Sequence, residues 1–231
     1  DMTLAQTKAS VSFPDAAELA RLAAQFEPTP LRVDTGALST GDKQALVKLI
    51  EAARLLNVVF MKQYWSGDLA AYEQLKADKS ALGEARLRYF WINKGPWSSL
   101  EDYKAFMPGV PPRKLAGANF YPEDMTKSEF ESWLKSLPQD QQKRATGFFT
   151  VIRRDAHHKL TIVPYSQEYK NELTRGAALL REAAGLTDNV SLKEFLTKRA
   201  AAYESNDYYE SDMAWMDLDS WEADPHTLVV P

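Results

Sequence analysis

The sequence predicts an α+β fold that is predominantly α-helical and contains one small β-hairpin. Apolar side chains recur at helical spacing along most of the 231 residues, and several of these runs begin at Ser or Thr, which are common helix N-caps. One stretch, residues 148–164, is instead rich in Phe, Thr, Val and Ile, which favour strands. The length suffices for one large domain or two small ones.

A long helix is predicted from Ser39 to about Tyr64, preceded by a polar tether and a first helix over residues 1–27. At about 100° per residue, one face of the long helix is apolar. Its members are Leu46, Leu49, Ile50, Ala53, Leu56, Phe60, Met61 and Tyr64. Asn57 lies within this stripe, and we interpret it as a hydrogen-bonded core amide, with a functional role as the alternative.

Residues 93–122 are dense in Pro, Gly and aromatic side chains and contain no evident helix or strand. Loops of this length are often functional. The alternative is a loop wrapped on a helical face and anchored by four aromatic side chains. These are Trp97, Phe106, Phe120 and Tyr121.

Two capping boxes predict helix starts at Thr126 and Ser191, with Trp133 in the core-facing stripe of the first helix. Another helix is expected over residues 166–184, ending at Gly185. Residues 148–154 and 160–164 predict the hairpin. Alternation puts one apolar set, Phe149, Val151, Leu160 and Ile162, on one face and a second set, Phe148, Thr150 and Ile152, on the other. A ribbon with two apolar faces needs cover on both, and the neighbouring helices are expected to supply only one, which favours self-association or a docked partner.

Composition and motifs exclude several classes of protein. The net charge of −4 and the pI near 5.5 argue against a nucleic-acid surface, and no apolar run reaches the roughly 20 residues of a membrane span. The absence of Cys excludes disulfides, thiolate nucleophiles and Cys-ligated metals. His157, His158 and His226 do not form a zinc-binding His-Glu-x-x-His helix, so we expect neither a metal site nor catalysis from this chain's own residues.

Five segments nevertheless resemble, in order, landmarks of bacterial dipeptidyl-peptidase III-type zinc peptidases. They are residues 89–97 (YFWINKGPW), 116–126 (AGANFYPEDMT), 150–155 (TVIRRD), 163–170 (VPYSQEYK) and 211–217 (SDMAWMD). The resemblance covers the N-terminal part of such an enzyme, over residues 28–217. Residues 218–231 depart from the pattern as a divergent tail, with a possible short strand at 227–230.

This resemblance implies a partial mixed β-barrel around the hairpin, and zinc held by a helix that lies later in the family's sequence. It also implies a loop that approaches the peptide groove. The matching positions here make Asn93, Trp97, Ser99 and Leu100 the candidates for the groove, although Leu100 stands where relatives carry Phe.

We therefore interpret the chain as scaffold and groove wall of a zinc peptidase that releases dipeptides from peptide N-termini, without catalytic or metal-binding residues of its own. Its partners would be peptide substrate and either the missing C-terminal half or a second copy at the hairpin. The alternative is a stand-alone, non-catalytic helical module that binds a peptide or a partner protein. The opening at Asp1 and the polar tether favour export, with a cytoplasmic location as the alternative.

Overall fold

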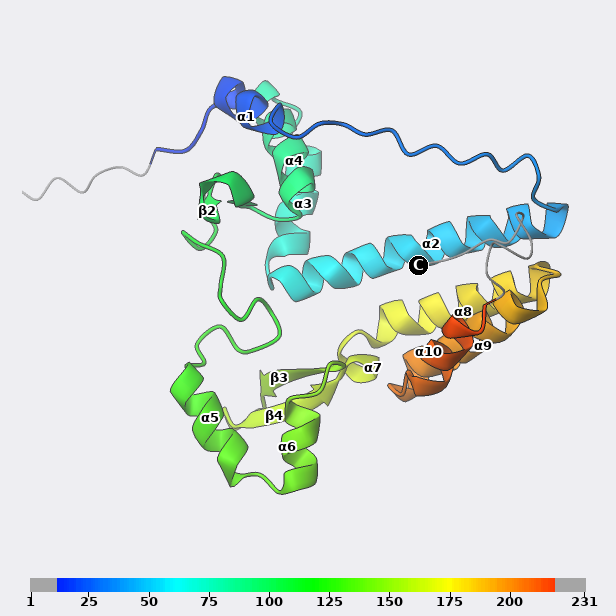
Figure 1. The fold of residues 1–231 in the computed structure, drawn as a ribbon. Helices are drawn as coiled ribbons and strands as arrows, with labels where there is room; N and C mark the ends of the chain where they lie inside the picture. Colours follow the sequence, from blue (N-terminus) through cyan, green and yellow to red (C-terminus); the bar gives the residue numbers. More distant parts are fainter. Residues whose placement is uncertain (1–11, 219–231) are drawn as a thin grey trace, which may run out of the picture. The chain divides into compact units, whose positions relative to one another are not determined.

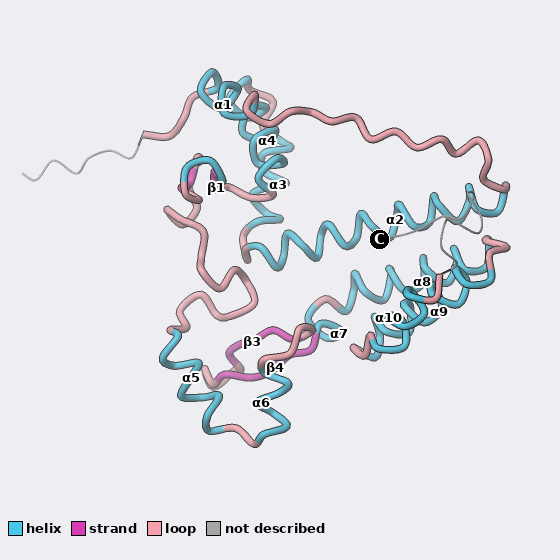
Figure 2. Tube along the Cα trace, viewed as in Figure 1, coloured by secondary structure: helices cyan, strands magenta, loops and turns pink. Residues whose placement is uncertain are grey.

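A computed structural model describes residues 12–218, and within them the chain is α+β and mostly helical, as predicted (Figure 1). The strands of this part form two separate two-stranded antiparallel sheets and no closed barrel (Figure 2). None of its helices is long and apolar enough to cross a bilayer. The described residues divide into two compact units, the first comprising residues 12–29 and 64–116 and the second residues 30–63 and 117–218.

The first unit is built on helix α4 (Ala81–Asn93), which packs against α1 (Ala16–Ala23) and α3 (Asp68–Ala77). Its core is aromatic: the rings of Tyr89 and Phe106 pack edge to face, with their centroids 4.9 Å apart. Two very short strands, β1 (Trp97–Ser98) and β2 (Lys104–Ala105), enclose a single 3-10 turn. Both strands lie within residues 93–122, where the sequence predicted neither a helix nor a strand.

The second unit contains α8 (Lys170–Leu186), α9 (Val190–Ser205), α10 (Tyr209–Met216) and all but the last residue of α2 (Thr40–Tyr64). Helices α8 and α9 form an antiparallel pair, and α10 packs on α9 (Figure 1). Leu49, Leu180 and Leu196 are buried in their shared core. At Gly41 a Cβ atom would lie 2.2 Å from the carbonyl oxygen of Leu186, so only glycine allows this close approach.

The predicted start of α2 is confirmed, because the Ser39 hydroxyl accepts a hydrogen bond from the backbone N–H of Asp42 at 3.0 Å. The predicted apolar face of α2 is only partly buried, because Leu56 and Phe60 remain more than 40% exposed. Asn57 is half-buried, and its amide contacts the sulfur of Met61 at 3.8 Å. The helix therefore carries an apolar strip that the described residues leave partly open.

The hairpin of β3 (Thr150–Arg154) and β4 (Leu160–Pro164) is confirmed, but its predicted faces are wrong. Ile152 pairs directly with Ile162, so these two side chains share a face, and Leu160 shares it with them. Val151 lies on the opposite face, and both Val151 and Ile152 are 1% exposed. Both faces are thus covered at β3, which removes the physical reason for expecting self-association there.

Helices α5 (Lys127–Ser136) and α6 (Gln139–Ala145) precede the hairpin. The predicted N-cap of α5 is confirmed, since the Thr126 hydroxyl accepts from the N–H of Glu129 at 3.1 Å. Trp133 is only half-buried and α5 has no fully buried residue, so the core position predicted for Trp133 was wrong. This helix packs on the surface of the unit rather than in its core.

Two further helix boundaries differ from prediction. The N-cap of α9 is Asn189, whose side chain accepts from the N–H of Leu192 at 2.9 Å, while Ser191 lies inside the helix. The helix expected over residues 166–184 is split at Tyr169 into α7 (Tyr165–Glu168) and α8, and Gly185 lies within α8 rather than after it. The predicted strand at 227–230 and the N-terminal tether fall outside the described residues.

Candidate functional site

The candidate site is the loop between the end of α4 and Arg113, which we call the α4 loop. Helix α4 ends because Lys94 adopts the left-handed conformation, at φ 57°, and the N–H of Gly95 then bonds the carbonyl of Phe90 at 3.1 Å. A Cβ at Gly95 would lie 2.3 Å from a ring carbon of Tyr64. Glycine is therefore required where the chain turns out of the helix.

Asn93 and Ser99 hold the first turn of the α4 loop. The side-chain oxygen of Asn93 accepts from the backbone N–H and from the hydroxyl of Ser99, and its side-chain nitrogen donates to the carbonyl of Tyr89. The structure thus brings together two of the four residues that the sequence indicated. Their polar atoms are used in hydrogen bonds within this part of the chain.

Trp97 forms the base of the α4 loop. It is fully buried, and its indole N–H donates to the carbonyl of Pro111 at 2.8 Å. Its ring centroid lies 5.8 Å from that of Tyr64 and 5.5 Å from that of Trp65. Leu100, by contrast, is 45% exposed at the tip. Of the four indicated residues, Leu100 therefore presents the largest apolar surface to solvent.

The tip of the α4 loop is backbone-strained. Asp102 and Tyr103 are consecutive non-glycine residues with φ of 52° and 53°, a conformation that costs free energy and persists only where neighbouring contacts enforce it. Arg113 supplies such contacts: its Nη1 donates to the carbonyl of Asp102 at 2.6 Å and also pairs with the Asp102 carboxylate. Strain of this kind is common in binding loops.

Charge is distributed unevenly around the α4 loop. The Lys114 ammonium lies over the rings of Tyr64 and Tyr103, 4.1 and 5.3 Å from their centroids. Asp68, the first residue of α3, is fully buried, and neither of its carboxylate oxygens has a hydrogen-bond partner within the described residues. Burial raises the pKa of Asp68 to about 8.

Sequence reasoning missed Asp68, the Asp102–Arg113 pair and Tyr103. Asp68 follows Ser66-Gly67, a sequence typical of an exposed helix start, so nothing in the pattern indicated its burial. Asp102 had a weak signal, because Asp tolerates the left-handed conformation better than most residues. Tyr103 had none.

The polar groups of the α4 loop are engaged within the loop itself. The Ser99 hydroxyl is bonded to an amide and not to a base. Within residues 12–218 no three His, Cys, Asp or Glu side chains lie so that they could hold a metal ion. His157 and His158 are exposed in the turn between β3 and β4, and His226 lies outside the described residues. The fold and the site together define a helical α+β chain with an ordered surface loop.

Comparison with known proteins identifies solved structures that are similar to this chain. The chain is similar to the solved structure of dipeptidyl-peptidase III from Corallococcus sp. strain EGB, with 48% identity and a TM-score of 0.86 over 90% of this chain and 39% of that one. It is also similar to the structure of DPP III from Caldithrix abyssi, with 45% identity and a TM-score of 0.82 over 87% of this chain and 38% of that one. The resemblance expected from the sequence is thus confirmed, and the chain spans about two fifths of these relatives.

No family model matches the chain. Among curated proteins it is 36% identical over 244 residues to Nudix hydrolase 3 of Arabidopsis thaliana, a match that takes in 85% of this chain and 32% of the plant protein. Two thirds of the plant protein therefore lie outside the match, so its name does not identify the part that is similar here. The dipeptidyl-peptidase III structures have the higher identity.

Proposed function

We propose that this chain is the helical scaffold and part of the substrate-groove wall of a dipeptidyl-peptidase III-like zinc peptidase, which releases dipeptides from the N-termini of peptides. The observation that carries the proposal is the 45–48% identity over about nine tenths of the chain to two structures of that name. Zinc-activated water would supply the hydrolysis. Since the described residues offer no group of metal ligands, we assign zinc to the part of such a peptidase that this chain does not match.

In this proposal the α4 loop contacts the peptide. Asn93 and Ser99 hold the loop in one conformation, Trp97 supports it from below, and Leu100 offers the apolar contact. An ordered loop loses little conformational entropy on binding, so it favours affinity. The remainder of the peptidase would be the second partner, docking beside the hairpin where Phe148 is 90% exposed.

A chimera tests the proposal. The matching part of the Corallococcus enzyme is replaced by this chain, and zinc content and hydrolysis of a dipeptidyl-arylamide are measured. We expect activity in the chimera and none in this chain alone. A folded, zinc-loaded chimera without hydrolysis would contradict the scaffold assignment.

The groove assignment is tested separately within the chimera. Leu100→Asp should raise KM about tenfold with little change in kcat, because it removes an apolar contact made equally in the ground and transition states. Val190→Asp is the matched control, since Val190 is an exposed apolar residue at the start of α9. Equal KM values for the two variants would remove Leu100 from the groove and leave the scaffold proposal standing.

A further inference from the structure

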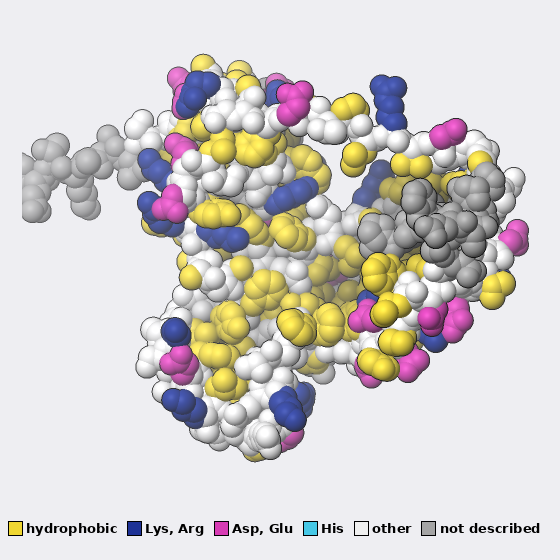
Figure 3. Space-filling model, in the orientation of Figure 1, with side chains coloured by type: hydrophobic (Ala, Val, Ile, Leu, Met, Phe, Trp, Pro, Cys, Tyr) yellow, Lys and Arg dark blue, Asp and Glu magenta, His cyan; other side chains and the backbone are white. Residues whose placement is uncertain are grey.

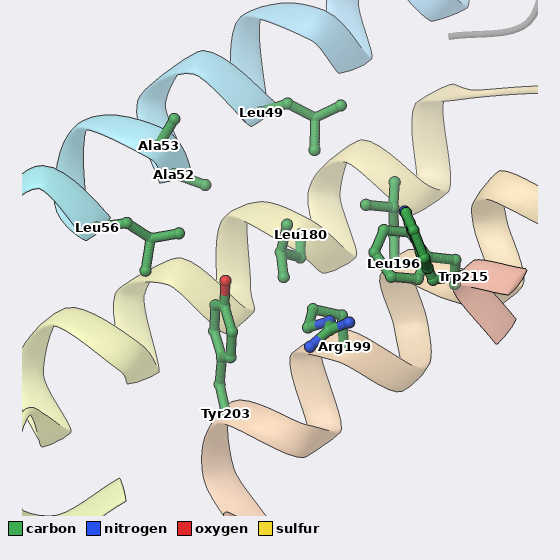
Figure 4. A pocket seen from close by; sticks show the side chains of 10 residues that line it. Leu49, Ala52, Ala53, Leu56, Leu180, Leu196, Arg199, Tyr203 and Trp215 are labelled. Atoms are coloured by element: carbon green, nitrogen blue, oxygen red, sulfur yellow. The ribbon is translucent and has the colours of Figure 1, made fainter. Parts of the chain in front are cut away.

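The second unit contains a cavity of about 470 Å³ that the proposed function does not use. Helices α2, α8, α9 and α10 all contribute to its wall (Figure 4). The lining residues are mostly apolar, among them Leu49, Leu56, Leu180, Leu196 and Trp215. This volume falls within the range of about 300–1,000 Å³ that is typical of small-molecule sites.

Two polar side chains of α9 interrupt the apolar wall. Figure 4 shows the ring of Tyr203 directed from α9 toward α2, with its hydroxyl at the α2 end, and Arg199 beside it on the same helix. Burial raises the pKa of Tyr203, so its hydroxyl stays a neutral donor. A few placed polar groups in an apolar wall are the usual means of orienting a ligand.

Arg199 is held in place but retains donors for a ligand. Its Nη2 bonds the Asp212 carboxylate at 2.7 Å, and its guanidinium lies 5.3 Å from the ring centroid of Phe195. A guanidinium has five N–H groups, so an ion pair through one nitrogen leaves others to meet a second acceptor. Asp212 is mostly solvent-exposed, which weakens its competition with a ligand anion inside the cavity.

The cavity opens to solvent. Leu56 and Trp215, which both line it, are 41% and 47% exposed. Figure 3 shows hydrophobic side chains gathered among acidic ones on the surface over α9 and α10. Contiguous exposed apolar surface rimmed by polar residues commonly marks a binding site.

We propose that this cavity binds a small apolar molecule that ends in a carboxylate, with the apolar part between α2 and α9 and the carboxylate on Arg199 and Tyr203. The charge of the guanidinium and the neutral phenol select an anionic acceptor over an alcohol of the same length. A medium-chain fatty acid and the carboxyl end of an apolar peptide share this chemistry.

Calorimetric titration of the full chain with octanoate and with octanol tests the proposal. We expect saturable 1:1 binding of octanoate, about tenfold tighter than octanol, which is the range of one charge-assisted hydrogen bond. A parallel titration with acetyl-leucyl-leucine distinguishes a fatty acid from a peptide carboxyl end. Tighter binding of octanoate indicates a fatty acid, and tighter binding of acetyl-leucyl-leucine indicates a peptide. Absence of saturable binding by all three compounds would overturn the proposal.

Variants locate the site. Arg199→Gln should bring octanoate affinity down to that of octanol, and Arg199→Lys should retain part of the difference. Ala53→Phe should abolish the binding of both octanoate and octanol, because the larger side chain fills the cavity. Arg181→Gln is the matched control, because Arg181 pairs with Glu204 outside the cavity wall and should leave both affinities unchanged.

Two results would contradict the assignment even if octanoate binds. Equal affinities of octanoate and octanol would mean that Arg199 does not select the carboxylate. Binding that appears only when the chain is shortened to end at Leu218 would mean that the segment after Leu218 occupies the cavity instead.

Discussion

The side-chain oxygen of Asn93 accepts two hydrogen bonds from Ser99, at 2.9 Å from its backbone N–H and at 2.8 Å from its hydroxyl. The side-chain nitrogen of Asn93 donates to the carbonyl of Tyr89 at 2.9 Å. One residue at the end of α4 therefore joins the helix to the first turn of the α4 loop. This amide group is therefore the main side-chain contact between α4 and the first turn of the loop.

Asn93→Ala should lower the free energy of unfolding by about 1–3 kcal/mol, because it removes two hydrogen bonds from the exposed Ser99 and one part-buried bond to the carbonyl of Tyr89. Ser99→Ala should cost only about 0.5–1.5 kcal/mol, since the backbone bond to Asn93 survives. Urea unfolding measures both, and amide hydrogen exchange at Ser99 should accelerate in Asn93→Ala. Asn57→Ala is the control, because the Asn57 amide makes only a weak contact with Met61. Equal stability of Asn93→Ala and wild type would contradict the role given to this amide.

Asp68 should make stability fall as pH rises. Its pKa is about 8 in the folded state against an ordinary value of 3.8, so the folded state holds a proton that the unfolded state loses. Both states are protonated below pH 3.8, so the penalty is absent there. It grows by up to about 1.4 kcal/mol per pH unit until the folded pKa is passed, and is constant above it.

Asp68→Asn should therefore be more stable than wild type at neutral and alkaline pH, with a difference that vanishes toward pH 4. Urea unfolding at four pH values checks this. Asp78→Asn, at the other end of α3, is the control of opposite sign, because hydrogen bonds to Ser80 lower the pKa of Asp78. Its carboxylate stabilises the folded state above the ordinary pKa and loses that effect as pH falls. A pH-independent difference between Asp68→Asn and wild type would show that the buried carboxyl finds a partner.

The helix caps of the second unit give a third test. Thr126→Ala and Asn189→Ala should each cost about 0.5–2 kcal/mol, since each side chain satisfies a backbone N–H at a helix start. Ser191→Ala should cost less, because Ser191 lies inside α9. Thermal unfolding of the three variants ranks them. A larger loss for Ser191→Ala than for Asn189→Ala would restore Ser191 as the cap.

The cap of α9 illustrates what local sequence can and cannot predict. Ser191 and Glu194 have the spacing of a capping box, but Asn189 is an equally good cap two residues earlier, and the structure uses Asn189. The start of α2 at Ser39 and the cap at Thr126 were both predicted correctly.

The larger errors of the sequence prediction concern features that depend on contacts between residues far apart in the sequence. The hairpin was recognised from its strand-forming residues, but the register that puts Ile152 opposite Ile162 depends on the turn geometry and reversed the predicted faces. Asn93, Ser99 and Leu100 were indicated by resemblance, whereas the burial of Asp68 depends on the packing of the first unit and has no sequence signature. Asp102, the first residue of the strained pair, is likewise bonded by Arg113, eleven residues away.

Arg113 should control the mobility of the α4 loop without contributing much to global stability. Its bonds to Asp102 lie at the surface, where an ion pair contributes about 0–1 kcal/mol. We expect the same bonds to keep Asp102 and Tyr103 in the left-handed conformation, so Arg113→Met should let the tip relax. Amide exchange at Tyr103, whose N–H bonds the carbonyl of Ser98 at 2.9 Å, should then accelerate at least tenfold while the unfolding midpoint changes little. Arg181→Met removes a comparable exposed ion pair with Glu204 and should leave exchange in the α4 loop unchanged. If Tyr103 exchanges equally fast in wild type and in Arg113→Met, another contact holds the tip and the strain does not depend on this pair.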